Sequence, residues 1–278
     1  MELQQSIELL KQQGFGLAAI SYDSVAILKS FADRKNITFP LLADPDSKVI
    51  RAFGILNETV PKDSGVYGIP YPLTYMVSPE GVIVSRIVDE DFRQRYTVGD
   101  ILSGKLPVRN PATQAEAQTK HLKLTTSASD TVIRPGERVR LLIDIEMKPL
   151  MHVYAPGVEG YIPIAWKMAE SAGFAVKDVE FPESHKLHLA AIDETVPVFQ
   201  GKFTLQREIV IGQPKALIPA LKEGKELAVE GTLRYQACDD RMCYLPQNVP
   251  LKWTFKFEPL DTQRSPVQIQ HKLGPSAK

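Results

Sequence analysis

The two cysteines of the sequence, Cys238 and Cys243, lie in one short stretch at residues 235–246 (YQACDDRMCYLP), with four residues between them. Such a pair can form a disulfide that opens and closes by exchange, in which a thiolate attacks a disulfide sulfur. It could also be a structural clip, or two unrelated buried thiols. A bridge that closes so short a loop removes little entropy from the unfolded chain, roughly 2 kcal/mol in free energy. A chain of 278 residues can instead take its stability from a hydrophobic core. We therefore predict a reversible disulfide, with a passive disulfide as the leading alternative.

The residues around the cysteines bear on their reactivity. Asp239 and Asp240 lie between them and are expected to raise the thiol pKa, an effect that the following arginine opposes. The spacing leaves open which cysteine attacks. Tyr154, Tyr235 and Tyr244 could line the site, although aromatic residues at strand spacing more often belong to a core.

Alternating apolar residues lead into the thiol pair at residues 227–235 and leave it at residues 249–257. A period of two predicts two strands joined by the loop that carries the cysteines. The same alternation begins near His121 and recurs between turn signals such as Pro135-Gly136. Further predicted strands are residues 122–127, 139–145, 164–168, 174–179 and 203–211. Several short strands at this spacing predict an antiparallel sandwich.

The first part of the chain has a different pattern. Apolar residues at helical spacing alternate with short apolar runs, and the loop at residues 78–81 (SPEG) predicts a hairpin. We therefore expect an incomplete α/β domain over residues 1–105, closed by a helical turn at residues 100–102. Residues 106–119 are polar and contain proline, which indicates a linker. Residues 120–260 form the β domain, and the polar segment 261–278 is predicted to be a disordered tail.

Composition excludes several classes of function. The charges balance, with 33 basic and 33 acidic residues, and no basic stripe suggests a nucleic-acid partner. No apolar stretch is long enough for a transmembrane segment, and residues 1–12 do not have the pattern of a signal peptide. The histidines are scattered and no glycine-rich phosphate loop is present, so we predict neither a metal nor a cofactor site.

Three stretches of the first domain resemble the thioredoxin-like redoxins of the AhpC/TSA (peroxiredoxin) family. They are residues 14–23 (GFGLAAISYD), 39–45 (FPLLADP) and 72–81 (PLTYMVSPEG). The resemblance implies a thioredoxin-like fold and a cis proline facing the active site. That proline maps onto Pro72, with Pro70 as the competing candidate.

The same resemblance implies a catalytic cysteine at the start of the first helix, and the sequence has none there. Residues 1–3 (MEL) look like the position just after the Cys-x-x-Cys motif of these redoxins. We hypothesise that the natural protein begins upstream of Met1, because of a misplaced start codon or a stop codon read as selenocysteine. The alternative is a degenerate redoxin domain kept for docking or packing.

The second domain resembles the N-terminal periplasmic domain of the thiol:disulfide interchange protein DsbD. The resemblance rests on residues 235–246, supported by residues 152–154 (HVY) and 198–203 (VFQGKF). It implies an immunoglobulin-like fold, a location in the periplasm or cell envelope, and a thioredoxin-like protein or domain as electron donor or acceptor. It also favours Cys243 as the attacking thiol and places a cap loop at residues 193–198, which include Asp193 and Glu194.

Together these features predict a thiol–disulfide oxidoreductase that relays electrons through Cys238 and Cys243. One alternative is a non-catalytic binding module in which the disulfide only stiffens a loop. The other is a peroxiredoxin-type peroxidase in the full-length protein. Asp193 and Glu194 also form a possible acid–base pair, but acidic residues in loops are usually solvated.

Overall fold

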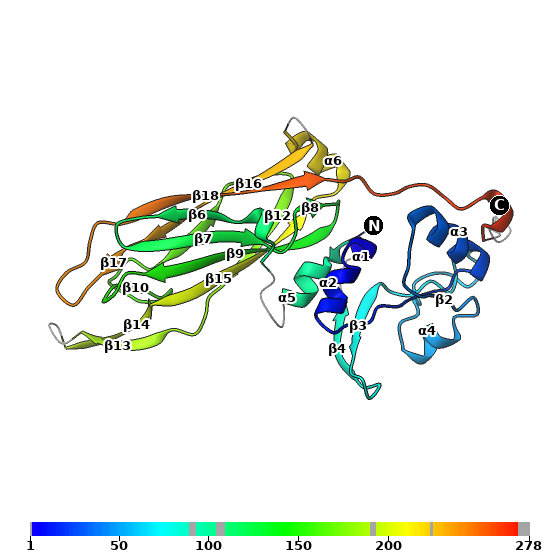
Figure 1. Cartoon of the computed structure of the whole chain (residues 1–278), viewed down its shortest axis with the longest axis horizontal. Coiled ribbons are helices and arrows are strands. Elements are labelled where there is room, and N and C mark those ends of the chain that lie inside the picture. The colour runs from blue at the N-terminus through cyan, green and yellow to red at the C-terminus, as the bar shows by residue number, and fades with distance from the viewer. Residues whose placement is uncertain (1, 89–92, 104–108, 190–192, 223–224, 272–278) are drawn as a thin grey trace. The chain divides into compact units, whose positions relative to one another are not determined.

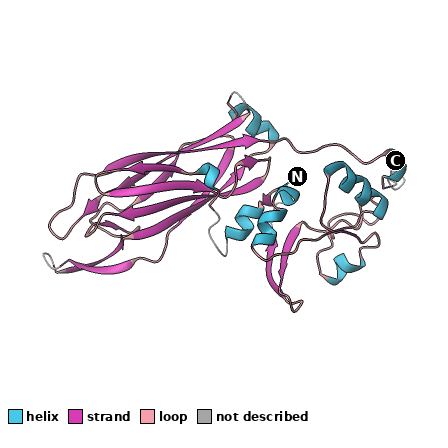
Figure 2. Ribbon diagram, in the orientation of Figure 1, coloured by secondary structure: helices cyan, strands magenta, loops and turns pink. Residues whose placement is uncertain are grey.

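The computed structural model of the chain describes residues 2–88, 93–103, 109–189, 193–222 and 225–271. These divide into two compact units (Figure 1). The first comprises Met1–Phe92 together with Asp261–Lys278, and the second comprises Arg93–Leu260. Helices dominate much of the first unit, and the second is built mainly of strands (Figure 2). No helix within these described ranges is long and apolar enough to cross a bilayer.

Short helices and strands alternate in the first unit, as its sequence pattern predicts. Helix α3 begins at Ser24, whose Oγ accepts a hydrogen bond from the backbone N–H of Ile27, and it ends at Asn36, which adopts a left-handed φ of 51°. Strands β1 and β2 pair in parallel, and β3 and β4 form an antiparallel hairpin. The elements are α1 (Glu2–Gln5), α2 (Ile7–Gln12), β1 (Ala19–Ser21), α3 (Val25–Lys35), β2 (Leu41–Ala43), α4 (Lys48–Ala52), β3 (Leu73–Val77) and β4 (Ile83–Val88).

The expectation of a cis peptide bond before Pro72 or Pro70 was wrong. No peptide bond in the described part of the chain is cis, so the bonds before Pro72 and Pro70 are trans. The trans form is the ordinary preference of an X–Pro bond unless tertiary packing selects the other isomer.

Residues 261–271, expected to belong to a disordered tail, instead contact the first unit. The Asp261 carboxylate lies 2.6 Å from the Arg34 guanidinium and 3.0 Å from Lys35 Nζ. His271 Nε2 lies 2.7 Å from the Asp23 carboxylate, and the His271 ring stacks on Tyr22 at 4.7 Å. These contacts attach the segment to the first unit because its few charged and aromatic residues meet complementary groups there. Residues 272–278 lie outside the described residues.

The boundary between the units also differs from the sequence-based expectation. Helix α5 (Val98–Ser103), expected to close the first domain, belongs to the second unit. The strand before it, β5 (Arg95–Tyr96), pairs in parallel with β9 (Glu137–Met147) and so ties this segment to the sandwich. The predicted linker contains a short helix, η1 (Pro111–Thr113), and a strand, β6 (Ala115–Gln118), that pairs with β7 (Leu122–Ala128). Backbone pairing, which polarity and proline content do not show, explains both differences.

The second unit is an antiparallel β-sandwich with a smaller sheet at one end, which confirms the predicted fold class. One sheet has the strand order β12-β15-β9-β7-β6, the second has β11-β16-β18-β8, and the smaller one has β13-β14-β10-β17. The remaining elements are β8 (Val132–Ile133), β10 (His152–Tyr154), β11 (Ala165–Met168), β12 (Phe174–Glu180), β13 (His185–Leu189), β14 (Glu194–Gln200), β15 (Lys202–Ile211), α6 (Pro214–Leu217), η2 (Ile218–Ala220), β16 (Glu226–Tyr235), β17 (Ala237–Cys238), β18 (Gln247–Phe257) and, in the first unit, η3 (Val267–Ile269).

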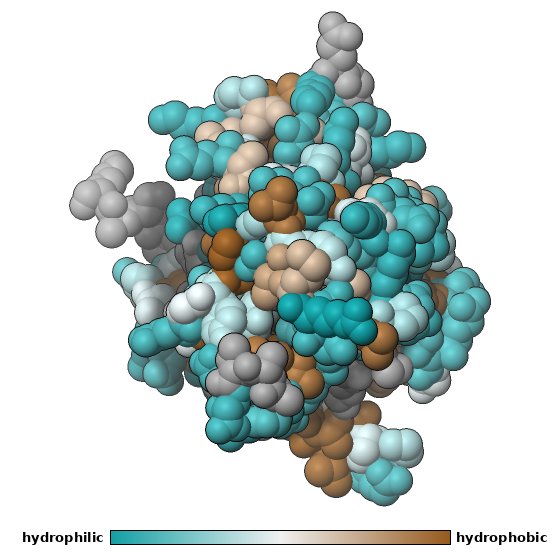
Figure 3. All heavy atoms as spheres, turned by 90° about the vertical axis from the view of Figure 1, so that its left-hand side faces the viewer, coloured by the Kyte–Doolittle hydropathy of each residue, from teal (hydrophilic) through white to brown (hydrophobic). Residues whose placement is uncertain are grey.

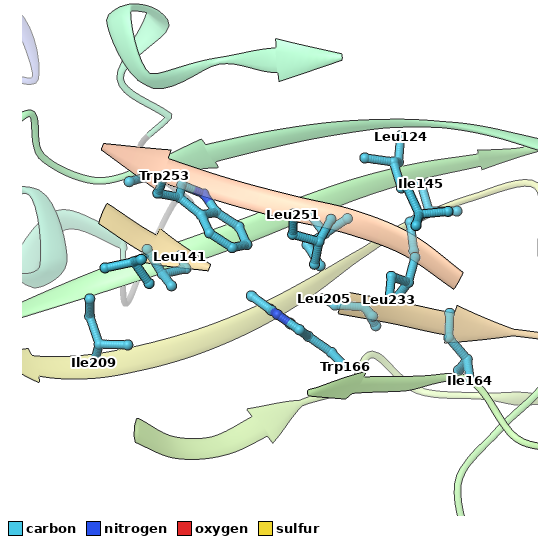
Figure 4. Close-up of a cluster of buried hydrophobic side chains, with 14 of the residues drawn as sticks. Leu124, Leu141, Ile145, Ile164, Trp166, Leu205, Ile209, Leu233, Leu251 and Trp253 are labelled. Carbon is cyan, nitrogen blue, oxygen red and sulfur yellow. The ribbon is translucent and has the colours of Figure 1, made fainter. Parts of the chain in front are cut away.

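The core lies between the two larger sheets (Figure 4). In β9, alternate residues such as Leu141 and Ile145 point inward and are almost fully buried. From the facing sheet, Trp166 and Trp253 stack at 5.6 Å, and the Trp253 indole N–H donates to the backbone oxygen of Ser127 at 2.9 Å. Burying a large apolar side chain stabilises a fold by roughly 1.5–3 kcal/mol, and many such side chains lie in this core.

The long β16–β18 pair holds the thiol pair at its end. The two strands pair in register from Glu226 opposite Lys256 to Tyr235 opposite Gln247, and the chain between them carries both cysteines. Immediately after β16, the short strand β17 leaves this sheet and joins β10 in the smaller sheet. The cysteine loop is therefore anchored to two sheets.

Candidate functional site

Cys238 and Cys243 form a disulfide with an S–S distance of 2.01 Å and a Cα–Cα distance of 4.0 Å. Cys238 lies in β17 opposite His152 of β10, and Cys243 faces Cys238 across an isolated antiparallel bridge. The two residues differ in accessibility, because Cys238 is 1% exposed whereas Cys243 is an exposed residue. A partner can therefore approach Cys243 more readily than Cys238.

Asp239 organises the loop between the cysteines. Its Oδ1 accepts hydrogen bonds from the backbone N–H groups of Arg241 and Met242, both at 2.8 Å. Its Oδ2 accepts a third from the hydroxyl of Tyr244, also at 2.8 Å. The two backbone hydrogen bonds are the main reason that the pKa of Asp239 lies below its ordinary value. The carboxylate predicted to act on thiol reactivity thus holds the shape of the loop directly.

Tyr154 is the predicted aromatic residue that reaches the disulfide. Its hydroxyl lies 3.6 Å from Cys243 Sγ, and its side chain is otherwise buried. Burial raises the pKa of Tyr154, with a further contribution from the charge of Glu194. The Tyr154 ring stacks on Tyr161 at 4.2 Å, and the Tyr161 hydroxyl donates a hydrogen bond to Glu194. That hydrogen bond raises the pKa of Tyr161 to about 12. A line of contacts therefore connects Glu194, through two tyrosines, with the accessible cysteine.

His152 lies directly across the strand ladder from Cys238, on the same face of β10 as Tyr154. Its ring meets that of Tyr154 edge-on at 5.4 Å. Its Nε2 is buried without a hydrogen-bond partner among the described residues. Burial lowers the pKa of His152, although the charge of Asp239 acts in the opposite direction. A neutral imidazole is therefore expected beside the buried cysteine near neutral pH.

The hairpin of β13 and β14 covers one side of the site. Val196 and Val198 pack in one cluster with Tyr154 and Cys238, and Leu187 packs against it. Residues 193–198 were expected to form a cap loop. This expectation was wrong, because all of these residues except Asp193 lie in strand β14. Pairing with both β13 and β10 satisfies its backbone and makes it a strand. Residues 190–192, at the turn of this hairpin, lie outside the described residues.

Exposed hydrophobic side chains flank the accessible cysteine. Met242 is 57% exposed and Leu245 is 82% exposed. At the end of the molecule where β13, β14 and β17 lie, the surface is mostly hydrophilic, with small groups of hydrophobic side chains (Figure 3). Apolar contacts next to an exposed cysteine suit the transient docking of another protein.

Other predicted site residues lie apart from the disulfide. The Asp193 side chain is 96% exposed, and its carboxylate lies 3.7 Å from His188 Nε2. Tyr235 is fully buried in the main core, where its hydroxyl lies 2.7 Å from Thr119 Oγ1. Pro72 precedes β3 in the first unit, whereas both cysteines belong to the second. Cys238, Cys243, Tyr154, Asp239 and Glu194 are the predicted residues that the fold connects.

Three residues near the thiol pair were not predicted as site residues: His152, described above, Tyr161 and His121. Tyr161 lies in a loop between Gly160 and Ile162, so no alternation marked it. His121 is buried, and its ring lies 4.6 Å from that of Tyr244. Both of its ring nitrogens are buried without a hydrogen-bond partner in the described part of the chain. A histidine at the start of a strand carries no signal of such a position.

Two families match the chain in sequence. Residues 1–86 match the AhpC/TSA family, and residues 119–252 match the N-terminal domain of the thiol:disulfide interchange protein DsbD. These two matches cover separate parts of the chain, called below the redoxin segment (residues 1–86) and the DsbD-type domain (residues 119–252). The DsbD-type domain contains both cysteines and the residues around them, and the redoxin segment corresponds to most of the first unit.

Individual relatives match the redoxin segment. A protein of Mycobacterium tuberculosis is 37% identical over 71 residues, which are 26% of this chain and 45% of that protein. Peroxiredoxin Bcp of Xanthomonas campestris pv. campestris is 34% identical over 71 residues, or 26% of this chain and 44% of that protein. The chain thus spans less than half the length of these curated relatives.

Among solved structures, the chain is similar over part of its length to the N-terminal periplasmic domain of ScsB from Proteus mirabilis. The two are 13% identical, with a TM-score of 0.36 over 52% of this chain and 51% of that one.

Proposed function

We propose that this chain is a thiol–disulfide oxidoreductase that relays electrons through the Cys238–Cys243 pair. The observation that carries the proposal is the difference in accessibility within one disulfide, with Cys243 exposed and Cys238 buried. A passive clip has no need of an exposed sulfur. The exposed Met242 and Leu245 beside it offer contacts for a protein partner.

The disulfide exchange proceeds in two steps. A thiolate of the donor attacks Cys243 Sγ, the Cys238–Cys243 bond breaks, and Cys238 leaves as a thiolate that takes up a proton. A second donor thiolate then attacks the donor sulfur of the mixed disulfide and releases Cys243, so the pair gains two electrons and the donor becomes a disulfide. Transfer to a substrate disulfide is the reverse sequence, begun by the Cys243 thiolate and completed by attack of Cys238 on Cys243 Sγ.

The surrounding residues have distinct roles in this proposal. The Tyr154 hydroxyl is placed to donate a hydrogen bond to a Cys243 thiolate. The neutral imidazole of His152 is placed to exchange a proton near Cys238. Asp239 keeps the loop in a shape that brings the two sulfurs together. Glu194 accepts a hydrogen bond from Tyr161, whose ring stacks on that of Tyr154. Asp193 and Tyr235 have no such contact with the pair in the described part of the chain, and Pro72 belongs to the first unit.

The proposed partner is a thioredoxin-like protein or domain, and the proposed location is the periplasm or cell envelope. Both are supported by the match of residues 119–252 to the DsbD N-terminal family. Disulfide exchange between proteins operates in such oxidising compartments.

A peroxidase activity of a longer protein is the second candidate, and the peroxiredoxin-named relative of the redoxin segment favours it. Peroxide turnover by the protein expressed from its complete natural gene tests it. Because both cysteines of this chain lie in the DsbD-type domain, a Cys238→Ser, Cys243→Ser double variant of that protein should keep peroxidase activity if the redoxin supplies it.

The principal experiment combines a reduction potential with trapping of a mixed disulfide. A structural disulfide resists the glutathione pool and has a potential below about −300 mV. We expect a more oxidising value here. We also expect a Cys238→Ser variant, which leaves Cys243 free, to accumulate a mixed disulfide with a thioredoxin that lacks its resolving cysteine and whose remaining cysteine carries a thionitrobenzoate leaving group. The Cys243→Ser variant is the matched control and should trap much less, because Cys238 is buried. A potential below that limit without trapping by either variant would establish a structural role.

A further inference from the structure

Arg207 lies in the row of β15 whose side chains face the core. Its neighbours at alternate positions, Leu205 and Ile209, are fully buried between the sheets. The residues between them, such as Glu208, point to the other face, where Glu208 pairs with Arg138. An arginine in the inward-facing row is unusual, because a charge is rarely buried without a partner of opposite sign.

The surroundings of Arg207 supply aromatic stacking, but Arg207 forms no ion pair with an acidic side chain among the described residues. Its guanidinium carbon lies 5.2 Å from the centre of the Trp166 ring, a cation–π arrangement. Neither its Nε nor the indole Nε1 of Trp166 has a hydrogen-bond partner among the described residues, and both atoms are buried. Asp178 is the acidic residue that acts on Arg207, from outside ion-pair distance in the described structure. Burial lowers the pKa of Arg207, but a guanidinium remains charged under all ordinary conditions.

These two side chains line an open groove at the side of the sandwich. Its volume is about 470 Å³, and it lies between β11, the last strand of one sheet, and β12, the last strand of the other. The Trp166 side chain extends from β11 into the space between the sheets (Figure 4). The other residues that line the groove are Lys167, Met168, Ala169, Glu170, Ser171, Phe174 and Val176. The groove therefore combines apolar side chains with charged ones of both signs, and Arg207 and Glu170 form no ion pair within the described structure.

Strand β11, beside the groove, is an edge strand of its sheet. β11 pairs with β16 along one side, and within the described chain no strand pairs with its other side. An exposed strand edge offers backbone N–H and C=O groups at the spacing of an extended peptide, which can add to the sheet. Apolar walls such as Phe174 and Val176 suit alternate side chains of that peptide.

We propose that this groove binds an extended peptide segment of a partner protein, which adds to the free edge of β11 and places an aspartate or glutamate carboxylate against Arg207. The carboxylate supplies the acceptor that the guanidinium lacks, in the geometry that arginine favours. The site is separate from the disulfide, and it does not depend on the redox activity proposed above.

The test uses the full oxidised chain and the fluorescence of its two tryptophans, one of which lines the groove. The probe is an acetylated and amidated peptide, Val-Thr-Glu-Thr-Val, compared with the same peptide containing glutamine in place of glutamate. We expect the glutamate peptide to change the emission saturably and the glutamine peptide to bind about tenfold or more weakly, as for an unpaired buried charge. Equal binding of the two peptides, or no binding of either, would overturn the proposal.

Acetate distinguishes a peptide site from a simple carboxylate site. We expect sodium acetate to compete only at much higher concentration than the peptide, because it makes no contact with the strand edge or the apolar walls. Competition at the concentration of the peptide would show that the groove binds small carboxylates, which contradicts the peptide proposal.

Variants assign the preference to Arg207. Arg207→Met should abolish the preference for glutamate, and Lys177→Met is the matched control, since Lys177 is an exposed cation on β12 that does not line the groove. Arg207→Met should not lower the melting temperature, because it replaces an unpaired, partly buried charge with an apolar side chain. If Arg207→Met fails to fold, Arg207→Lys serves instead. It keeps the charge and should retain the preference with weaker binding. Persistence of the glutamate preference in Arg207→Met would refute the assignment.

Discussion

The hydroxyl of Tyr154 lies 3.6 Å from the Sγ of Cys243. The two residues are 89 positions apart in the sequence and are brought together because β17, which carries Cys238, pairs with the strand that contains Tyr154. A hydroxyl at this distance can donate to a sulfur that becomes negatively charged when the disulfide opens.

Replacing Tyr154 with phenylalanine tests this contact. A hydrogen bond to a charged group contributes roughly 1.5–3 kcal/mol, so loss of the hydroxyl should lower the thiolate population of Cys243 about tenfold at neutral pH. The measurement is the pH dependence of alkylation by iodoacetamide in a Cys238→Ser background. The pKa of Cys243 should rise in the Tyr154→Phe variant.

Tyr235→Phe is the control for that measurement, since its hydroxyl contacts Thr119 in the core instead. It should cost some stability and leave the alkylation profile unchanged. Identical profiles for Tyr154→Phe and Tyr235→Phe would remove Tyr154 from the mechanism.

Asp239 should make the stability of the cysteine loop depend on pH. Its pKa is lower in the folded protein than in the unfolded chain, because it accepts two backbone hydrogen bonds and one from Tyr244. The stabilisation is therefore complete above the ordinary aspartate value of about 3.9, and it is lost as the pH falls through the lower folded value. Asp239→Ala should be less stable than the wild type at neutral pH, and this difference should shrink in strong acid.

Chemical unfolding across that pH range measures the difference. Asp240→Ala is the matched control, because Asp240 is exposed and lies next to Asp239 on the same loop. A stability difference for Asp239→Ala that does not change with pH would show that the charge of the carboxylate is not responsible.

Glu194 should control the ionisation of Tyr161. The hydrogen bond between them raises the pKa of Tyr161 to about 12. Glu194→Gln should return this pKa toward the ordinary value of about 10, and Asp193→Asn should not, since the Asp193 side chain is 96% exposed. A near-ultraviolet titration of tyrosinate, assigned with a Tyr161→Phe variant, provides the measurement. An equal response to both substitutions would contradict the assigned contact.

Replacing Gly136 with alanine should destabilise the protein more than the same change at Gly157. Its φ is +81°, and a Cβ placed there would lie 2.0 Å from the backbone oxygen of Arg93. Gly157 has a similar φ of +87° but no atom within 4 Å of an added Cβ. Gly157→Ala should therefore cost only the conformational strain, roughly 1–2 kcal/mol, and Gly136→Ala should cost clearly more. Urea unfolding of the two variants compares them, and equal losses would count against the clash.

Local patterns were sufficient to predict much of the fold. Alternation predicted the long strands of the sandwich, because a period of two places one row of side chains in the core. The start of α3 is equally local, because the Ser24 side chain accepts a hydrogen bond from the backbone N–H of Ile27. The pattern misplaced the boundary between the units, since the pairing of β5 with β9 joins segments whose own residues carry no signal of each other.

The candidate site shows the same division. By itself the sequence determined which residues can carry the redox chemistry, because Cys238 and Cys243 are its two thiols and lie on one loop. Only the tertiary structure decided that Cys243 is exposed, that Tyr154 touches it, and that Tyr235 and Asp193 stand apart. It also placed an unpaired Arg207 in a groove between two sheet edges. The physical reason is that burial and contact depend on which strands pair, and strand pairing joins residues far apart in the chain.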